Sequence, residues 1–458
     1  MTDPLDAVSP LDGRYAGRTA PLRPYASEAA LMRARTRVEV EYLLALADEP
    51  GVPLELDGAE RERSRAVYGS FDADDAGLIK RLETEGAAGY AATNHDVKAV
   101  EYFLRIRLDG LERAHPWLHF GLTSEDVTNL AYRLLVRGAV DEVLAPELEA
   151  VRGRLVSLAR EHRDAPMLAR THGQPATPTT FGKELAVYAA RLDAGLDRLA
   201  AATGDLAGKL AGASGTYAAH HAALPDVDWR AVSAAFVDSL GLRHQPLATQ
   251  VNPGDDLAAV FDALRGLNRV LVDLDRDCWQ YVSLGYLRQR TAEGETGSST
   301  MPHKVNPIDF ENAEGNLEKA TSDLDHLAGA VTTSRLQRDL SDSTVKRNVG
   351  AALAHCLIGY TKTAAGLESI APDAEAMRAD LEAHPEVLAE AIQTVLRREG
   401  HADAYERVKA LTRGEAVTLD SLRAAIDDLD VDDDVRDELA SLEPVEYVGL
   451  ASALVDEL

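Results

Sequence analysis

The sequence predicts an all-α protein of three domains, and three observations carry this prediction. Long segments are rich in Ala, Leu, Arg and Glu, which are strong helix formers. Apolar residues recur every three or four positions from Asp255 to about Gln289, further than in an average globular helix. No segment of comparable length alternates apolar and polar residues, so we expect no large sheet. At about 150 residues per domain, a chain of 458 residues suggests roughly three domains.

The predicted helices have recognisable starts. Ser27 is a candidate N-cap for a helix from Glu28 to about Asp48. The stretch 123–126 (TSED) resembles a capping box before a long helical run to about Glu161. Another helix is predicted to start at Asn306, with Pro307 in its first position. The apolar residues that recur after Asp255 form a stripe along one helix face, and other helices are needed to cover it. The stripe comprises Leu257, Phe261, Leu264, Leu267, Leu271, Leu274, Cys278 and Tyr281.

Loops dense in Gly, Pro, Ser and Thr separate these helices, at 8–24, 86–96, 164–181, 203–217, 245–255 and 291–307. Breaks near His115-Pro116 and Ile370-Ala371-Pro372 suggest domains at 1–115, 116–367 and 368–458. The strongly acidic stretch 418–458 still contains recurring apolar residues, so we expect a solvated helical face there.

Composition narrows the function classes. The chain has 76 acidic and 48 basic residues, a net charge of −28, which argues against nucleic-acid or membrane partners. No apolar run approaches the length of a transmembrane helix, and the first residues lack a signal-peptide pattern. The two cysteines, Cys278 and Cys356, are far apart, which suggests a reducing cytosol. We therefore expect a cytoplasmic protein.

Lysine is scarce, since only nine of the 48 basic residues are lysines. An acidic, lysine-poor surface stays hydrated where salt screens its self-repulsion, so we interpret the chain as salt-adapted, or halophilic. A GC-rich genome that favours arginine would explain the lysine deficit equally well, but less of the acidity.

Residues 294–307 (GETGSSTMPHKVNP) combine glycines, paired hydroxyls at Ser298 and Ser299, and a cation at Lys304. They lead into a predicted helix N-terminus, whose free N–H groups favour anions. A serine beside a lysine and free backbone donors can be held partly as an alkoxide, which is a usable base. The alternative is an ordinary Gly/Ser surface loop.

Residues 171–178 (THGQPATP) cannot form a regular helix, so His172 is expected on a rigid turn. Histidine suits proton donation near neutral pH. A capping or core histidine is the alternative.

Two further clusters carry polar side chains. Asn94-His95-Asp96 suits hydrogen bonding to a polar ligand, or equally the cap of the following helix. In 338–348 (RDLSDSTVKRN), Ser343 and Thr344 lie near a predicted helix start with two arginines close by, which suits a phosphate or carboxylate clamp. A capped helix with surface ion pairs is the alternative. No cluster has metal-ligand spacing, and His220-His221 is interpreted as structural.

Together these segments resemble the adenylosuccinate lyase branch of the fumarase/aspartase superfamily. The GSSxMPxKxNP stretch at 297–307 is similar to that superfamily's signature loop. The PHK form also occurs in carboxymuconate cycloisomerases. TNHDVKAVEYF, THGQPATP and RDLSDSTVKRN then favour the adenylosuccinate lyase branch. The likeness runs from VSPLDGRY (8–15) to LTRGEAV (411–417), nearly the whole chain.

The resemblance implies a central long-helix bundle and elimination of fumarate from adenylosuccinate and from succinylaminoimidazole carboxamide ribotide (SAICAR), with no cofactor or metal. It implies Ser298 as general base and His172 as general acid, with Lys304 and Asn306 stabilising the developing anion. The residues it assigns to substrate binding are Arg14, Tyr15, Asn94, His95, Asp96, Thr123, Ser124, Gln250, Ser299, Lys304, Val305, Asn306, Asn312, Arg338, Ser343, Thr344, Val345, Lys346 and Arg347.

Lys346 departs from the family pattern, in which an apolar residue is common at this position, and we expect its side chain to face solvent. The resemblance also implies a homotetramer whose active sites combine residues of three subunits. This agrees with the apolar stripe at 257–281, which we expect to be uncovered within the chain and which suggests packing between subunits. The competing hypotheses are a related lyase or cycloisomerase with a different acid, and a non-enzymatic helical protein.

Overall fold

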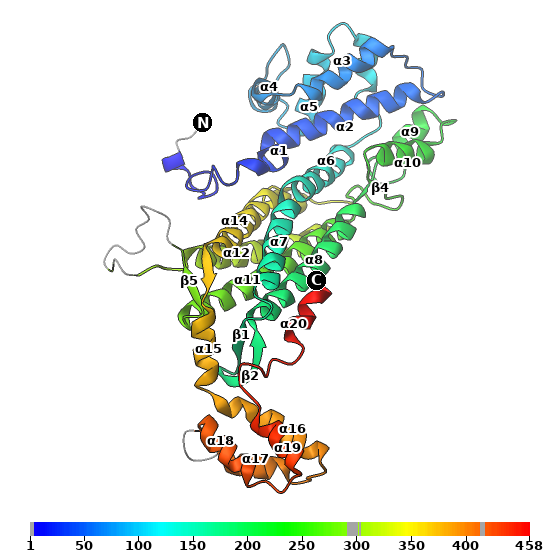
Figure 1. Ribbon diagram of the computed structural model, residues 1–458. Coiled ribbons are helices and arrows are strands. Elements are labelled where there is room, and N and C mark those ends of the chain that lie inside the picture. Colours follow the sequence, from blue (N-terminus) through cyan, green and yellow to red (C-terminus); the bar gives the residue numbers. More distant parts are fainter. Residues whose placement is uncertain (1–3, 291–300, 302–303, 413–416) are drawn as a thin grey trace. The chain divides into compact units, whose positions relative to one another are not determined.

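The computed structural model of the protein describes residues 4–290, 301, 304–412 and 417–458. Figure 1 shows that helices dominate this part of the chain, with only short strands, which confirms the all-α prediction. The described strands form three separate two-stranded sheets. Among the described residues, no helix combines the length and apolar character that crossing a membrane requires.

The chain forms two compact units, each assembled from three stretches of sequence. Unit 1 comprises Met1–Leu148, Gly195–Arg269 and Gly315–Tyr360, and unit 2 comprises Glu149–Ala194, Val270–Glu314 and Thr361–Leu458. Five helices continue across these boundaries: α7 (Ala145–Glu161), α8 (Phe181–Gly204), α11 (Asp255–Ser283), α12 (Ile308–Val331) and α14 (Val349–Ser369). The division into three consecutive domains stays a prediction.

Unit 1 also contains most of the N-terminal helices, with the parallel pair β3 (Ala207–Gly208) and β4 (Arg243–His244). Its helices are α1 (Arg23–Ala26), α2 (Glu28–Asp48), α3 (Gly58–Gly69), α4 (Ala73–Thr84), α5 (Asp96–Arg107), α6 (Ser124–Ala139), α9 (Ala218–Ala223), α10 (Trp229–Ser239) and α13 (Ser341–Lys346). The predicted caps are confirmed: Ser27 accepts from the Ala30 N–H, and Thr123 forms a capping box with Asp126. A π-turn, Val140–Leu144, joins α6 to α7, so the predicted helical run continues to Glu161.

Unit 2 contains two antiparallel pairs, β1 (Pro166–Thr171) with β2 (Gln174–Thr180) and β5 (Leu287–Gln289) with β6 (Ile370–Pro372). Its remaining helices are α15 (Ala374–Glu382), α16 (Ala389–Arg398), α17 (Ala404–Thr412), α18 (Leu419–Asp427), α19 (Asp433–Ala440) and α20 (Ala451–Leu454). Despite its acidity, the C-terminal stretch buries Leu422, Ile426 and Leu439 in a common apolar cluster. The expected helical face with recurring apolar residues is therefore confirmed.

Within each unit the long helices pack against one another. In unit 1, the Cβ position of Gly195 on α8 lies 2.4 Å from Leu267 of α11, and that of Gly359 on α14 lies 2.4 Å from Leu317 of α12, so a larger residue at either position would require the leucine to move. In unit 2, Thr363 of α14 donates a hydrogen bond to the buried Asp275 of α11. These contacts hold the central helices together as a bundle.

Two expectations about α11 are wrong. The stripe from Leu257 to Cys278 is already buried within the single chain, so it does not itself call for a second subunit. The helix also ends at Ser283 rather than near Gln289. Gly285 has a φ of +77°, and the Tyr286 N–H donates to the Tyr281 carbonyl, which closes the helix in the manner of a Schellman motif.

Candidate active site

The start of α6 is fixed by a buried polar network in unit 1. The backbone N–H of Thr123 donates to Asp126 Oδ2 at 2.8 Å, and the Asp126 Oδ1 accepts from the Ala211 N–H at 2.8 Å. Lys209 Nζ lies 2.9 Å from the same Oδ1, and both side chains are fully buried. Because a buried ion pair needs well-placed partners, this network holds Thr123 and Ser124 against the segment after β3.

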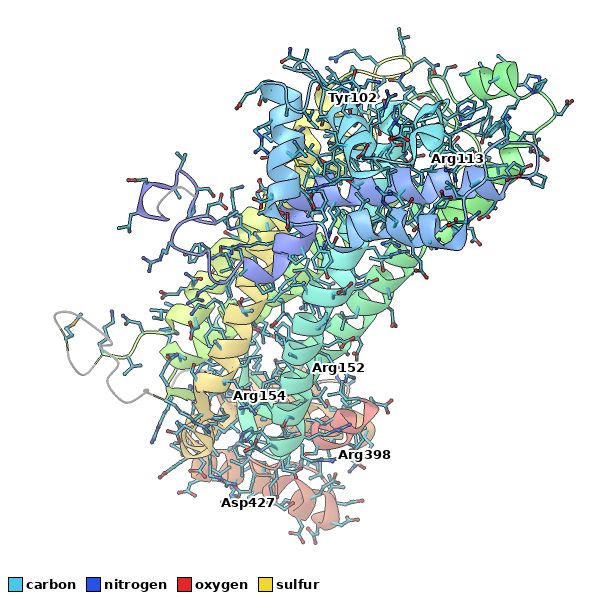
Figure 2. The ribbon with its side chains drawn as sticks, turned by 90° about the horizontal axis from the view of Figure 1, so that it is seen from above. Tyr102, Arg113, Arg152, Arg154, Arg398 and Asp427 are labelled. Atoms are coloured by element: carbon cyan, nitrogen blue, oxygen red, sulfur yellow. The ribbon has the colours of Figure 1, made fainter. Side chains whose placement is uncertain are left out.

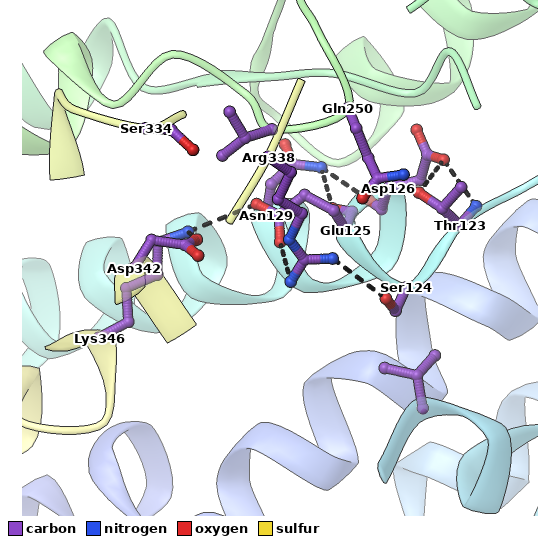
Figure 3. Close-up of polar contacts among 12 residues, drawn as sticks. Thr123, Ser124, Glu125, Asp126, Asn129, Gln250, Ser334, Arg338, Asp342 and Lys346 are labelled. Atoms are coloured by element: carbon purple, nitrogen blue, oxygen red, sulfur yellow. Dashed lines mark hydrogen bonds and ion pairs between the residues drawn. The ribbon is translucent and has the colours of Figure 1, made fainter. Parts of the chain in front are cut away.

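Gln250 joins the same region. Its Nε2 donates to the carbonyl of Ala213 at 3.1 Å. Figure 3 shows Gln250 beside Thr123, Asp126 and Arg338. Three segments that are distant in the sequence therefore bring predicted substrate-binding residues together, in the described part of unit 1.

Arg338 points at the first turn of α6 (Figure 3). Its Nη1 lies 3.4 Å from Ser124 Oγ, and its Nη2 lies 3.4 Å from Glu125 Oε2. The Arg338 side chain is 14% exposed, whereas that of Glu125 is 1% exposed. A partly accessible guanidinium next to a hydroxyl suits the recognition of a carboxylate or phosphate.

Lys346 does not face solvent, so that expectation is wrong. The residue is only 5% exposed. Its Nζ donates to Asp342 Oδ2 at 2.7 Å and to Glu125 Oε1 at 3.4 Å. A buried ammonium is tolerated only with such partners, and the two carboxylates supply them.

Asp96 and Arg347 form a second ion cluster at the start of α5. Asp96 Oδ2 accepts from Arg35 at 2.8 Å and from Arg347 at 3.3 Å, while Arg347 also donates to Glu28 at 2.6 Å. Burial alone would raise the pKa of Asp96, but the Arg35 guanidinium, a hydrogen bond from the Val97 N–H and the charge of Arg347 together outweigh it and lower that pKa. Arg347 also lines a pocket with Glu28 and Tyr132.

His95 is the N-cap of α5, because its Nδ1 accepts from the Lys98 N–H at 3.2 Å. Asn94 before it has a left-handed φ of +50°, which asparagine tolerates better than most residues. The capping interpretation of this cluster is therefore confirmed for His95, whose exposed ring edge leaves a role in ligand binding open.

The remaining predicted residues of unit 1 lie on two short segments. Ser343, Thr344 and Val345 belong to α13, and Arg347 directly follows its last residue. Arg14 and Tyr15 lie on the N-terminal loop, where the Tyr15 N–H donates to the Pro10 carbonyl. Arg14 is exposed and Tyr15 is half-buried.

In unit 2, His172 lies at the tip of a tight β-hairpin. Thr171 pairs with Gln174, and the two residues between them, His172 and Gly173, have φ values of +54° and +74°. Two consecutive left-handed residues are the requirement of a type I′ turn. The rigid turn predicted for His172 is confirmed, although the flanking residues form strands rather than a loop.

Lys304, Val305, Asn306 and Asn312 surround the start of α12. The helix begins at Ile308, two residues later than predicted, and the Pro307 carbonyl accepts from the Glu311 N–H. Lys304 is exposed and Asn306 is half-buried. Ser298 and Ser299 lie outside the described residues.

Sequence reasoning missed the charged residues beneath the site. Glu125, Asp126 and Asp342 are buried acids inside recognised motifs. The sequence predicts only the capping role of Asp126 and assigns no role to the other two. Lys209 had a usable signal, since it is one of nine lysines and stands alone in an apolar, glycine-rich stretch (LAGKLAGASG). A lone lysine in such surroundings is expected to be buried with a carboxylate partner.

Comparison with known proteins gives two adjacent family matches. Residues 25–322 match the family described as "Lyase". Residues 334–448 match the family described as "Adenylosuccinate lyase C-terminal". Together they cover all but the ends of the chain and a short connection.

Curated relatives match over nearly the full length. Adenylosuccinate lyase of Legionella pneumophila (strain Corby) is 45% identical, with 98% of each chain covered. That of Escherichia coli (strain K12) is 43% identical, with 99% of each covered. That of Dictyostelium discoideum is 41% identical, with 97% of each covered.

Solved structures share the fold at lower identity. The crystal structure of fumarate lyase from Mesorhizobium sp. BNC1 has a TM-score of 0.75 and 22% identity, over 96% of this chain and 97% of that one. The 3-carboxy-cis,cis-muconate lactonizing enzyme from Pseudomonas putida has a TM-score of 0.72 and 22% identity, over 96% of each chain. The fold agrees with the fumarase/aspartase superfamily, and the sequence match is far closer to one branch of it. The chain belongs to the adenylosuccinate lyase family.

Proposed function

We propose that this chain eliminates fumarate from adenylosuccinate, giving AMP, and from SAICAR, giving the corresponding carboxamide ribotide, in purine nucleotide synthesis. The observation that carries the proposal is the full-length likeness to adenylosuccinate lyases from several organisms, at 41–45% identity in the three relatives above. The C-terminal match is to a model specific to that family.

We propose Ser298 as the general base and His172 as the general acid. Ser298, as an alkoxide, removes a proton from the carbon next to a substrate carboxylate. The electron pair of that C–H bond forms the C=C bond of fumarate, the C–N bond breaks, and His172 protonates the departing nitrogen. Each proton transfer contributes roughly 10²–10⁴-fold in rate.

The type I′ turn supports the role of His172. Both turn residues are left-handed, so the backbone presents the imidazole from a fixed position between two paired strands. A general acid has to be held within hydrogen-bond reach of the atom it protonates, and a rigid turn meets that need better than a long loop.

The cations of the site match a substrate with a phosphate and two carboxylates. Arg338 has a partly accessible guanidinium beside Ser124, and Lys304 is exposed just before α12. We propose that Arg338 binds a substrate anion and that Lys304 and Asn306 stabilise the negative charge that develops when the proton leaves. The other residues of the binding set are Arg14, Tyr15, Asn94, His95, Asp96, Thr123, Gln250, Ser299, Val305, Asn312, Ser343, Thr344, Val345 and Arg347, with Lys346 contributing its backbone only.

We propose a cytoplasmic homotetramer with composite active sites. His172 is exposed in the single chain, whereas a proton donor in an elimination works best shielded from water. A neighbouring subunit would supply that shield together with further ligands. Light scattering of the purified chain measures the assembly directly, and a folded, fully active monomer would contradict it.

The proposed function is tested with a panel of substrates in about molar KCl, to screen the protein's self-repulsion. We expect turnover of adenylosuccinate and SAICAR, which is measured as the loss of substrate absorbance. Argininosuccinate and carboxymuconate should not react. A folded protein that turns over carboxymuconate but neither succinylated purine compound would indicate the sister cycloisomerases instead.

A further inference from the structure

A buried charge cluster lies between α6 and α13, beneath the proposed substrate-binding residue Arg338. Its members are Glu125, Asp342 and Lys346, which are all at most 5% exposed. The Lys346 ammonium lies 2.7 Å from Asp342 Oδ2, 3.4 Å from Glu125 Oε1 and 5.9 Å from the centre of the Tyr132 ring. The proposed chemistry uses none of these three side chains directly.

Glu125 lies between two cations (Figure 3). Lys346 contacts its Oε1 and Arg338 contacts its Oε2, both at 3.4 Å. The Lys346 contact is a hydrogen bond at the weak end of the range, and the Arg338 contact is an ion pair without a hydrogen bond. The carboxylate is therefore shared, and neither cation holds it closely.

Arg338 is correspondingly loosely held. Its Nη1 reaches Ser124 Oγ only at 3.4 Å, and its Nε is buried with no hydrogen-bond partner among the described residues. Glu125 Oε2 and Asp342 Oδ1 are likewise buried without a hydrogen bond in that part of the chain. These carboxylate oxygens could therefore accept further hydrogen bonds from the nearby Arg338 guanidinium, which is proposed to bind a substrate anion.

Charge balance explains why Lys346 matters. The two negative charges of Glu125 and Asp342 are balanced by Lys346 and by the neighbouring Arg338, in a poorly solvated place. Without the ammonium, Glu125 and Asp342 would be left with Arg338 as the one cation in the described part of the chain that contacts either of them. Buried, unpaired carboxylates bind the remaining cation strongly, so the guanidinium would be drawn toward Glu125 and away from a ligand.

We propose that Lys346 is a positioning residue that neutralises Glu125 and Asp342 and thereby keeps the Arg338 guanidinium available for an anionic group of the substrate. This inference rests on the proposed function, because that function makes Arg338 a substrate ligand.

The test is a double-mutant cycle on Lys346 and Glu125, read out by steady-state kinetics with adenylosuccinate. Lys346→Met keeps the length of the side chain and removes its charge. We expect its KM to rise about tenfold or more, the size expected for one charged hydrogen bond to substrate, with kcat within about twofold. Lys346→Arg retains the charge and should keep KM within about threefold of the wild type.

Glu125→Gln is the deciding variant of the cycle, because it removes the carboxylate to which Arg338 would otherwise bind. In the Lys346→Met/Glu125→Gln double variant, KM should return to within a few-fold of the wild type. A merely structural role for Lys346 would not be rescued by removing a second charged group. The matched control is Lys319→Met, which removes an exposed lysine paired with Asp323 on α12 and should leave KM unchanged.

The outcomes separate the two proposals. If the wild type turns over adenylosuccinate but Lys346→Met leaves KM unchanged, or Glu125→Gln fails to rescue it, the positioning role is overturned while the function stands. If Lys346→Met does not fold, the double variant and Lys346→Arg decide the question, because both relieve the charge imbalance. A folded wild type without activity on either succinylated compound overturns the proposed function itself.

Discussion

His119 and Glu39 form an ion pair inside unit 1 that should make stability depend on pH. Glu39 is buried, and its Oε1 lies 2.5 Å from His119 Nδ1. Burial alone would lower the pKa of His119, but the neighbouring carboxylate outweighs burial and raises it. The folded protein therefore holds this proton more tightly than the unfolded chain does.

Because the pKa of His119 is higher in the folded protein than in the unfolded chain, the ion pair stabilises the protein more at low pH than at high pH. The stabilisation is fully present below the unfolded value near 6.5 and is lost as the pH rises through the higher folded pKa. We expect the difference in free energy of unfolding between the wild type and His119→Asn to shrink from about pH 6 to about pH 9. Asparagine suits this site because His119 has a φ of +57°.

Urea unfolding at several pH values measures this difference. Several other histidines, including His162 and His355, have pKa values lowered by burial, so only the wild-type-minus-variant curve isolates His119. Glu39→Gln should abolish the same pH dependence. A difference that is constant across the range would contradict the role of the pair.

At the same scale, the sequence predicted the chemistry of single residues better than their surroundings. His172 was expected on a rigid turn because Gly and Pro flank it, and local backbone rules were sufficient there. The burial of Lys346 was not predictable in this way, because it depends on Glu125, more than 200 residues earlier in the chain. Residue-level prediction is confirmed where the cause is local and is wrong where the cause is a tertiary ion pair.

The hairpin that holds His172 depends on a close approach between backbone segments in unit 2. Gly182, at the start of α8, follows β2 directly, and a Cβ there would lie 2.3 Å from the Ala159 carbonyl oxygen of α7. The Gly182 N–H also donates to the His162 carbonyl at 3.0 Å. The neighbour is backbone, which cannot move aside as a flexible side chain can.

We expect Gly182→Ala to destabilise the protein by about 1–3 kcal/mol, the usual cost of overpacking. Gly153→Ala is the matched control: it lies in α7 with no atom near its Cβ position. There alanine should be neutral or stabilising by up to about 1 kcal/mol, because it is the better helix former. Urea unfolding of both variants measures the effect, and equal stabilities would contradict the packing argument.

Element prediction succeeded where caps and periodicity agree. The helices after Ser27 and Thr123 begin where predicted, because their capping side chains bond to the first turn. The sequence predicts a loop around His172, in a segment that contains Pro175 and Pro178, whereas the structure places both prolines in β2. Proline is tolerated in such a pair because an isolated two-stranded sheet leaves an outer edge on each strand, where no N–H is needed.

The charge of the whole molecule is the basis for the proposed salt adaptation. With 76 acidic against 48 basic residues, carboxylates exceed the cations available to pair with them. Three arginines labelled in Figure 2 pair with carboxylates of their own unit: Arg113 with Glu60, Arg152 with Asp193 and Arg398 with Glu438. The excess of acids remains, and at low salt their mutual repulsion opposes the compact state.

We expect the thermal midpoint to rise as KCl is raised from about 0.1 M to about 2 M, since salt screens this repulsion. The relative from Escherichia coli, measured in parallel, controls for general effects of salt on the shared fold. A midpoint that does not change with KCl would favour the alternative, in which a GC-rich genome accounts for the scarcity of lysine.

At this largest scale the family was predictable from the sequence, because the motifs that resemble it extend over nearly the whole chain. The two compact units each draw on three separate stretches of sequence. The division into three consecutive domains stays a prediction. The buried stripe of α11 was expected to need further cover, because periodicity identifies an apolar face without identifying its partner.

We propose that this chain is a fumarate-releasing lyase in which His172 and Ser298 carry out the proton transfers. The most direct test is an assay in which the purified chain is mixed with adenylosuccinate in about molar KCl and the fumarate and AMP formed are both quantified. We predict fumarate and AMP in equal amounts, with His172→Ala and Ser298→Ala each slower by roughly 10²–10⁴-fold at unchanged circular dichroism. No products from a folded wild type, or near-normal turnover by either variant, would contradict the account.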